Sequence, residues 1–406
     1  MRLLRNIGEM ATCPPENPQH DAGLIRKAAL VIDDGIVAWS GPESDLPAKF
    51  EKLDATDCQG NLVIPGLIDC HTHLCFGGWR GDEFEMRLAG ASYQDIAAAG
   101  GGIASTVKAT REASADQLTR KAARILRHML ALGVTTVECK SGYGLDEKNE
   151  LKQLEIYRAL DAQQPVELVS TFLGAHIVPP EYAEDREAYI DLLIDVLIPR
   201  ITRDGLAEFC DAFVEAGAYT AEEARRLFEA ARRQGLKIKL HADQLSSGGG
   251  AALAAEVGAV SAEHLEYIDE DGISALAGSG TVAVSLPLAS LYLGERYLPA
   301  RRLIDAGVPV AVATDFNPGS APSFHLPLAM MLACLNQQMT PQETLMGATS
   351  RAARAIDRER RIGSLHAGYQ ADIAIIDAPS LNHWLYHFTP NACRRVFKEG
   401  IEVVLT

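Results

Sequence analysis

Short apolar runs alternate with longer segments of helical spacing through the middle of the chain. Ser114-Ala115-Asp116-Gln117 has the form of a capping box, and Gly133 stops the helix that follows it. A strand from Val134 to Cys139 is predicted directly afterwards. The same order returns at Thr220-Ala221-Glu222-Glu223, where a capped helix should run to Gly235 and lead into a strand from Ile238 to His241.

The pattern predicts eight such strands, near residues 62–70, 134–139, 166–173, 209–214, 236–241, 259–264, 281–286 and 308–314. Strands that alternate with helices form parallel sheets, and eight are enough to close a (β/α)₈ TIM barrel. The span from Val63 to His366 exceeds the ~250 residues typical of such barrels, so it has room for insertions. One of them, Gly100-Gly101-Gly102, lacks the lysine of a phosphate-binding loop and is expected near the site.

The two ends of the chain have a different pattern. Short β-like pieces occur within 28–64, at Ala29 to Ile32 and Gly35 to Trp39, and again within 371–377 and 393–404. Strands from both termini can pair only if the barrel brings the ends together. We therefore expect a small β-sandwich domain composed of residues 1–63 and 367–406, around a barrel of residues 64–366.

Composition narrows the possible partners and location. The chain has 406 residues and a formal net charge of -16, so nucleic acid is not expected as a partner. It has neither a secretory signal pattern nor an apolar run of the ~20 residues needed to cross a bilayer, so we expect a cytoplasmic protein without a membrane partner. The eight cysteines lack paired spacing and are interpreted as reduced, buried thiols.

The strongest candidate for chemistry is the segment Pro65-Gly66-Leu67-Ile68-Asp69-Cys70-His71-Thr72-His73. Successive side chains on a strand alternate faces, so His71 and His73 should point the same way, toward the barrel axis. Two imidazoles placed in this way can bind one metal ion. An HxH on a strand also arises by chance, so its interpretation depends on the other strand ends.

Three of those ends carry His241, His264 and Asp315. Barrel enzymes place their chemistry at the C-terminal ends of the strands. A core histidine bound to a carbonyl is the ordinary explanation for any one of them, but the set indicates a functional site.

Three imidazoles, one carboxylate and a water suit Zn or Fe better than magnesium. We expect His71, His73, His241 and Asp315 to bind one divalent or trivalent metal ion, which lowers the pKa of bound water to ~7. Either Asp315 or His264 could then act as the catalytic base and return the proton to a leaving nitrogen. Two ions bridged by a modified lysine are the rival arrangement. The strand near 209–214 offers no lysine for it, and Lys140 is interpreted as a polar residue near the pocket.

Over essentially its full length, the chain resembles the imidazolonepropionase family of the amidohydrolase superfamily of metal-dependent hydrolases. The superfamily's marks are Pro65 to His73, His241, His264, Asp315 and the tail Gly363-Ser364-Leu365-His366-Ala367-Gly368 leading into Ala371-Asp372. Narrower marks are Gly78-Trp79-Arg80, Gly100 to Thr106, Ser141-Gly142-Tyr143-Gly144, Gly174-Ala175-His176, His241-Ala242-Asp243-Gln244 and Asp315-Phe316-Asn317-Pro318-Gly319-Ser320.

The resemblance implies hydrolysis of the cyclic amide C–N bond of 4-imidazolone-5-propanoate to give N-formimidoyl-L-glutamate in histidine degradation, by an enzyme that forms a homodimer. It also implies a substrate shell of Arg80, Tyr143, His176, Gln244, Asn317, Gly319 and Ser320. A propanoate tail needs a cation in this acidic protein, and Arg80 can bind a carboxylate through two hydrogen bonds. Without the resemblance, each of these residues would be interpreted as structural.

Two alternatives remain open at this stage. An aminohydrolase of a heterocyclic base such as cytosine or guanine could use the same metal centre, but those bases carry no carboxylate for Arg80 and Tyr143. A non-catalytic barrel that serves in assembly should have lost metal ligands, which this chain retains. Some members of the family carry glutamate where this chain has Gln244, and an amide cannot act as a base. We therefore expect Gln244 to orient the ring.

Overall fold

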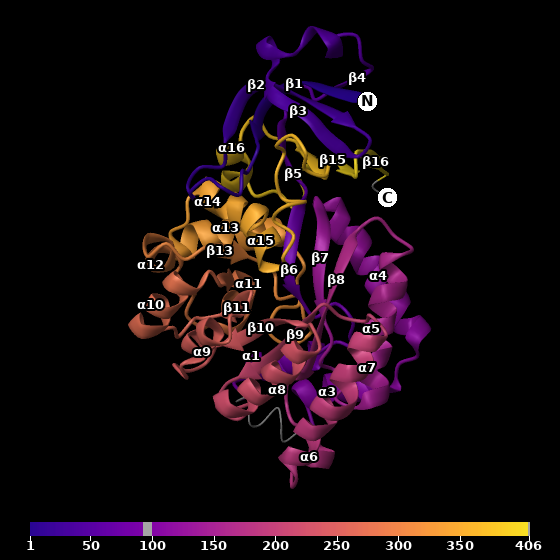
Figure 1. The fold of residues 1–406 in the computed structure, drawn as a ribbon, viewed down its shortest axis with the longest axis vertical. Coiled ribbons are helices and arrows are strands. Elements are labelled where there is room, and N and C mark those ends of the chain that lie inside the picture. Colours follow the sequence, from indigo (N-terminus) through magenta and orange to yellow (C-terminus); the bar gives the residue numbers. More distant parts are fainter. Residues whose placement is uncertain (92–99, 405–406) are drawn as a thin grey trace.

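The computed structural model describes residues 1–91 and 100–404 and contains two large sheets (Figure 1). Eight parallel strands form the first sheet, in the order β13-β12-β11-β10-β9-β8-β7-β6. They are β6 (Leu67–Thr72), β7 (Val134–Lys140), β8 (Glu167–Ala175), β9 (Phe209–Val214), β10 (Lys237–Ala242), β11 (Ser261–His264), β12 (Val282–Ser285) and β13 (Val310–Val312). All eight predicted strands are therefore confirmed.

The first and last strands of this sheet meet and close it into a barrel. The backbone N–H of His73 donates to the carbonyl of Phe316 over 2.8 Å, and that of Asp315 donates to the carbonyl of His71 over 3.1 Å. These bonds leave β6 and β13 joined at their C-terminal ends, so the predicted (β/α)₈ barrel is confirmed.

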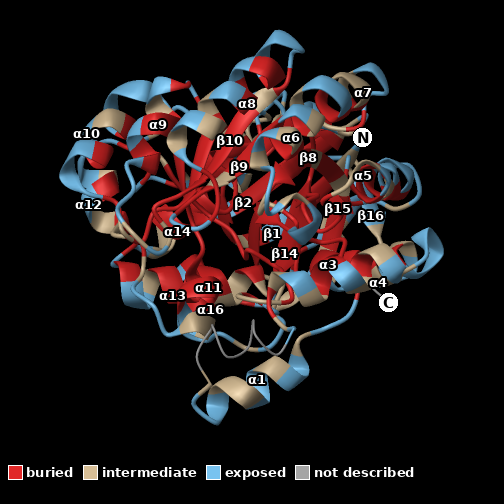
Figure 2. Ribbon diagram, turned by 90° about the horizontal axis from the view of Figure 1, so that it is seen from below, coloured by how far each residue is buried: buried red, intermediate tan, exposed pale blue. Residues whose placement is uncertain are grey.

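Helices surround the barrel, with exposed outer faces around buried strands (Figure 2). Two begin at the predicted capping boxes, α4 (Ala115–Ala131) after Ser114 and α8 (Ala221–Arg233) after Thr220. The other α-helices are α1 (Gly81–Leu88), α3 (Ile103–Glu112), α5 (Glu147–Asp161), α6 (Arg186–Asp191), α7 (Ile198–Arg203), α9 (Gly250–Glu256), α10 (Glu270–Ser279), α11 (Pro287–Leu293), α12 (Ala300–Asp305), α13 (Leu326–Gln337), α14 (Pro341–Gly347), α15 (Ser350–Ala355) and α16 (Leu381–Tyr386). Single turns are η1 (Glu43–Asp45), η2 (Ala48–Phe50) and η3 (Pro180–Tyr182), and η4 (Leu192–Leu197) is a π-helix between α6 and α7.

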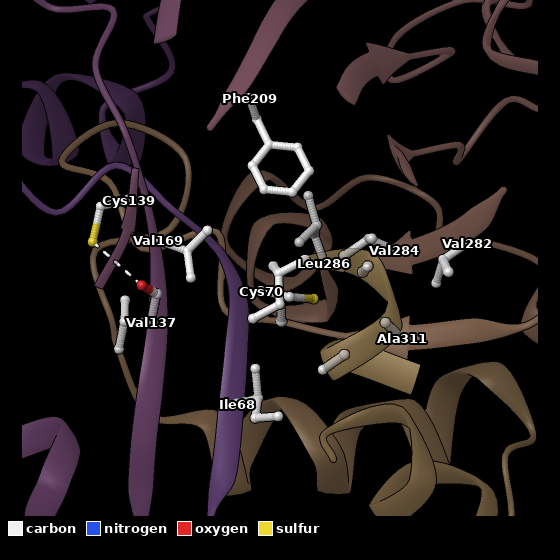
Figure 3. Packing of buried hydrophobic residues seen from close by; sticks show 14 of the residues in the cluster. Ile68, Cys70, Val137, Cys139, Val169, Phe209, Val282, Val284, Leu286 and Ala311 are labelled. Atoms are coloured by element: carbon white, nitrogen blue, oxygen red, sulfur yellow. Dashed lines mark hydrogen bonds between the residues drawn. The ribbon is translucent and has the colours of Figure 1, made fainter. Parts of the chain in front are cut away.

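The main core is one continuous apolar cluster that includes side chains from most barrel strands. Figure 3 shows part of it, with Ile68 and Cys70 on β6, Phe209 on β9, and Val137 and Cys139 on β7. All eight cysteines are free thiols, as expected; six are buried, whereas Cys334 and Cys393 are only partly buried, so burial holds for six of them.

The second sheet is mixed and is built from both ends of the chain, in the order β16-β15-β14-β5-β1-β2-β3, with β4 paired to β1. Its strands are β1 (Arg2–Ala11), β2 (Leu24–Asp33), β3 (Ile36–Pro42), β4 (Ala55–Asp57), β5 (Leu62–Pro65), β14 (Ile373–Ile376), β15 (Cys393–Lys398) and β16 (Ile401–Val403). We call it the terminal sheet. Strand β5 joins its two halves, since it pairs with β1 on one side and β14 on the other.

Strand β1 was not among the predicted strands. Its burial pattern does not alternate, and the pairing with β2 shifts between Leu4 and Ile7, where Asn6 adopts φ +54°. A β-bulge of this kind removes the period of two by which strands are found in a sequence. On the architecture seen here, we propose that residues 1–63 and 367–406 form one domain and residues 64–366 the other.

Only Gly66 separates β5 of the terminal sheet from β6 of the barrel. The terminal sheet therefore adjoins the N-terminal ends of the barrel strands, and their C-terminal ends face away from it (Figure 1). Across the described residues, none of the helices combines the length and apolar character that a bilayer crossing requires.

Candidate active site

The five residues singled out at the strand ends come together at the C-terminal mouth of the barrel. The Nε2 atoms of His71 and His73 lie 3.3 and 3.5 Å from the same oxygen, Oδ1 of Asp315. The ring centroid of His241 lies 4.6 Å from that of His71 and 5.5 Å from that of His264. None of the five side chains belongs to a residue more than 3% exposed. We call this group the histidine ring.

Several nitrogen atoms of the histidine ring have no hydrogen-bond partner among the described residues. They are both nitrogens of His71, Nδ1 of His73, Nε2 of His241 and Nδ1 of His264. A buried polar atom without a partner costs about 1–3 kcal/mol, so their convergence indicates a site for a group that completes them. Ligand atoms of His71, His73 and Asp315 lie within 4.8 Å of one another, as do those of His71, His241 and His264. Imidazole and carboxylate ligands fit a zinc or iron ion.

The electrostatics of the site favour metal-binding protonation states. Burial lowers the pKa of His71 well below its usual value, and the nearby Lys140 lowers it further. Burial also lowers the pKa of His73. For Asp315, burial raises the pKa, but the neighbouring His71 and His73, whose Nε2 atoms face its carboxylate, outweigh burial and bring the pKa well below the usual range. Neutral imidazoles and an ionised carboxylate are the forms that bind a metal ion.

The backbone is strained where it carries these side chains. His264 and the following Leu265 have φ of +75° and +66°, and Asp315 has φ of +55°. Residues other than glycine rarely adopt such angles, and they gather at functional sites. Glu266, one residue further on, lies 3.5 Å from Nδ1 of His264. Burial lowers the pKa of His264, but the Glu266 carboxylate outweighs burial and raises it.

A layer of buried charges lies directly beside the histidine ring. Nδ1 of His241 is 3.0 Å from Oδ1 of Asp211, whose other oxygen accepts a hydrogen bond from Nζ of Lys140 over 2.8 Å. Lys140 also donates to Glu138 over 2.9 Å, and these three charged residues are fully buried. Lys140 is therefore part of an ionic network, which the interpretation as a polar pocket residue did not foresee. The sequence does place charged residues within these apolar strands, Glu138 and Lys140 in β7 and Asp211 in β9, and this was the signal that could have predicted the network.

Arg80, Tyr143 and His176 stand at one side of the histidine ring. His176 stacks on His73, with ring centroids 5.4 Å apart, and the Tyr143 ring lies 5.7 Å from that of His73. Nε of Arg80 donates to Oγ1 of Thr106 on α3 over 2.8 Å. Burial raises the pKa of Tyr143, against a lowering influence of Arg80, so its phenol keeps its proton.

The loop that carries Tyr143 is fixed by a buried carboxylate which the sequence analysis missed. Glu150 on α5 accepts backbone N–H groups from Gly142, Gly144 and Leu145, the last two over 2.8 Å each. Its position in an ordinary helix gave no sign of this role, because the three donors lie in a loop outside that helix.

The turn after β13 holds Asp315 in place. Asn317 donates to the carbonyl of Asp315 over 2.6 Å and accepts N–H groups from Gly319 and Ser320, each over 2.8 Å. Oγ of Ser320 lies 3.2 Å from Oδ2 of Asp315. Gly319 lies directly against Arg80. A Cβ atom added at Gly319 would come within 2.3 Å of the guanidinium Nη1.

Gln244 lies in the loop directly after β10, three residues beyond His241, and is half-buried. Its side-chain amide makes no hydrogen bond to the described part of the chain. The structure therefore places this residue at the mouth, and its orienting role stays a prediction.

Comparison with known proteins shows the family to which the chain belongs. Residues 62–403 match the model of the amidohydrolase family. Imidazolonepropionase of Geobacillus thermodenitrificans (strain NG80-2) is 47% identical over 407 residues, which cover 99% of this chain and 96% of that protein. Imidazolonepropionase of Fusobacterium nucleatum subsp. nucleatum is 50% identical over 403 residues, which cover 98% and 97%.

Solved structures share the fold at low sequence identity. An adenosine deaminase from Xanthomonas campestris with bound zinc has a TM-score of 0.73 at 18% identity, covering 99% of this chain and 92% of that one. Atrazine chlorohydrolase from Arthrobacter aurescens TC1, complexed with zinc, has a TM-score of 0.75 at 16% identity, covering 100% and 95%. The sequence matches decide the finer assignment, and this chain belongs to the amidohydrolase family and, within it, to the imidazolonepropionases.

Proposed function

We propose that this chain hydrolyses the cyclic amide bond of 4-imidazolone-5-propanoate, giving N-formimidoyl-L-glutamate in the degradation of histidine. The observation that carries the proposal is the histidine ring with Arg80 beside it, on a chain that matches imidazolonepropionases over nearly its whole length. The imidazolone heterocycle of the substrate would lie over the five residues of the histidine ring, and its propanoate would extend toward Arg80.

We assign His71, His73, His241 and Asp315 as ligands of one zinc or iron ion. The unpartnered nitrogens of the three histidines support this assignment. When bound, such an ion supplies a water of pKa ~7 and draws charge from the carbonyl under attack. Burial of these residues also supports the assignment. It lowers the pKa of His71 and His73, and the neutral imidazole is the form that binds a metal ion.

The chain's own groups bind the substrate and move the proton. Arg80 binds the propanoate, and Thr106 and Gly319 fix the guanidinium between α3 and the turn after β13. Asp315 or His264 takes up the proton released during attack on the carbonyl and passes it to the leaving ring nitrogen. Both side chains face the same site, and the carboxylate of Glu266 keeps His264 in place.

Tyr143, His176 and Gln244 complete the proposed substrate shell. Nδ1 of His176 is 3.0 Å from the carbonyl of Gly142, so its other nitrogen is the one available to a ligand. Asn317 and Ser320 act mainly through the turn that holds Asp315. We further propose a cytoplasmic location and, by family resemblance, a homodimer.

The test follows the loss of imidazolone absorbance with purified, metal-loaded enzyme. Arg80→Ala should keep its metal. Its KM should rise by about 10–100-fold, which is the size of effect expected when a charge-assisted hydrogen bond to the substrate is lost. Arg120→Ala, at an exposed position on α4, is the control. An unchanged KM in Arg80→Ala would remove this arginine from substrate binding. Ammonia release from cytosine or guanine, without imidazolone turnover, would favour the deaminase alternative.

A further inference from the structure

Two buried lysine–carboxylate pairs lie side by side in the barrel. In the first, Nζ of Lys140 donates to Oδ2 of Asp211 over 2.8 Å. In the second, Nζ of Lys239 lies 3.1 Å from Oε1 of Glu263. All four residues are fully buried, and their strands, β7, β9, β10 and β11, surround the base of the histidine ring.

The two carboxylates also share a second kind of contact. Oδ1 of Asp211 accepts the backbone N–H of His241 over 3.3 Å, and Oε2 of Glu263 accepts the backbone N–H of Leu240 over 3.1 Å. Asp211 therefore links Lys140 of β7 to β10, whereas Glu263 links β11 to Lys239 and Leu240 of β10 itself. One contact separates them. Oδ1 of Asp211 lies at hydrogen-bond distance, 3.0 Å, from Nδ1 of His241, whereas the carboxylate of Glu263 comes only within 4.8 Å of that imidazole and makes no hydrogen bond to it in the described chain.

That contact fixes which ring nitrogen of His241 is directed at the site. Because the ionised carboxylate of Asp211 can only accept, Nδ1 of His241 donates the hydrogen bond and the lone pair is on Nε2, which is buried and has no partner among the described residues. Among the three histidines proposed as ligands, His241 has its Nδ1 held by a carboxylate, whereas Nδ1 of His71 and of His73 are both unpartnered within the described chain. A partner of this type commonly sets the tautomer and orientation of a ligating histidine.

We propose that Lys140 is a positioning residue for the metal centre, and that it acts through Asp211 to hold His241 in its ligand orientation. The ammonium binds the outer oxygen of Asp211 and leaves the inner oxygen directed at Nδ1 of His241. Lys140 is itself fixed by Glu138 at 2.9 Å and by the hydroxyl of Tyr157, which donates to its backbone carbonyl over 2.8 Å. This inference rests on the proposed role of His241 as a ligand.

Asp211→Asn is the main variant, because it keeps the size of the side chain and leaves Lys140 paired with Glu138. Glu263→Gln is its matched control, since it removes the equivalent carboxylate from Lys239 without touching a histidine side chain. The measurement is the Kd of Zn²⁺ for the metal-free protein, obtained by competition with a chelator, together with the thermal midpoint of each metal-free variant.

Asp211→Asn should raise the Kd for Zn²⁺ by about 10–100-fold, as loss of such a partner typically does. Glu263→Gln should leave it unchanged, although both variants lower the thermal midpoint. Lys140→Met should raise the Kd about tenfold while Lys239→Met does not, and Lys140→Arg should restore part of the affinity. If Lys140→Met does not fold, the Zn²⁺ affinities of Asp211→Asn, Glu263→Gln and Lys140→Arg still test the inference.

Equal Zn²⁺ affinity in Asp211→Asn and Glu263→Gln would overturn the inference. His241→Ala separates this failure from that of the proposed function. If His241→Ala weakens Zn²⁺ binding and Asp211→Asn does not, only the positioning role fails. If His241→Ala also binds Zn²⁺ as tightly as the unsubstituted protein, the proposed ligand set fails, and the inference fails with it.

Discussion

The mouth of the barrel and the terminal sheet carry backbone strain in different places. Non-glycine residues with positive φ in the terminal sheet and its turns are exposed at five positions, namely Asn6, Lys27, Asp34, Gln59 and Glu399, and Cys13 after β1 is the buried exception. Those that follow β10, β11 and β13 are all buried, namely Asp243, His264, Leu265 and Asp315. In the sheet, strain is confined to turns and irregular pairings. At the mouth it is built into the positions that present functional side chains, which indicates that these positions serve binding.

Ion pairs also differ between the two regions, apart from Lys398 of β15, which is buried in the terminal sheet with Asp372 at 2.8 Å. Arg395 and Glu402 of the terminal sheet form an ion pair at 2.6 Å, with about a third of each side chain exposed. The core beneath them is apolar and contains Phe397. At the mouth, Lys140 and Asp211 are paired with no exposure at all. Exposed pairs contribute about 0–1 kcal/mol, whereas buried charges depend strongly on their partners. Changes at the mouth should therefore affect metal and activity, and changes in the sheet should affect stability.

The largest effect is expected from Asp315→Ala. This variant removes a proposed ligand and a candidate base, so kcat/KM should fall by at least about 10³-fold and bound metal should be lost. Metal analysis and imidazolone turnover measure both, with the exposed Asp305→Ala as control. A metal-replete Asp315→Ala enzyme would contradict the assignment.

Phe397→Ala tests the opposite side of the comparison. Phe397 is fully buried in the core of the terminal sheet, and its truncation should cost about 3–5 kcal/mol of unfolding free energy. Denaturant unfolding gives this value, and Phe388→Ala, at a residue 60% exposed, should change it little. Zinc affinity and kcat/KM of the folded variant should stay the same. A parallel loss of metal affinity would show that the two regions do not act independently.

A smaller effect is expected where α3 contacts the site. Thr106→Val removes the hydroxyl that accepts from Nε of Arg80 and keeps the shape of the side chain. Loss of a hydrogen bond to a charged group, about 1.5 kcal/mol, should raise KM about tenfold with kcat unchanged. Steady-state kinetics measure the split, with Thr202→Val on α7 as control. A fall in kcat alone would point to a role other than positioning Arg80.

The smallest effect concerns the junction of the two regions. Glu167 on β8 lies 3.5 Å from Nζ of Lys398 on β15 and also pairs with Arg358 and Arg361. Burial raises the pKa of Glu167, but these cations outweigh burial and lower it below the usual 4.5. A lowered pKa stabilises the fold above pH 4.5, and this contribution is lost as the pH falls through the folded-state value.

Glu167→Gln should therefore destabilise the protein by about 1 kcal/mol at neutral pH. Denaturant unfolding at several pH values tests this. The difference from the unsubstituted protein should shrink as the pH falls below 4.5. A difference that grows in acid would contradict the sign of the shift.

The sequence predicted the barrel strands and the histidine ring, because both depend on local patterns. The spacing of His71 and His73 and the position of Asp315 at a strand end are visible without any knowledge of neighbours. The contacts of Lys140 are different, since they depend on β7 and β9 reaching across β8. Glu150 likewise serves a loop that lies outside its own helix. Partners brought together by folding leave little trace in the periodicity of either segment.

Three histidines and Asp315 are proposed to hold a single metal ion at the barrel mouth. Anomalous diffraction from crystals of the zinc-loaded protein tests it directly. We expect one metal peak, about 2.0–2.2 Å from nitrogen atoms of His71, His73 and His241 and from a carboxylate oxygen of Asp315. A peak bound by other residues, or a second peak of equal height between Asp211 and Glu263, would contradict it.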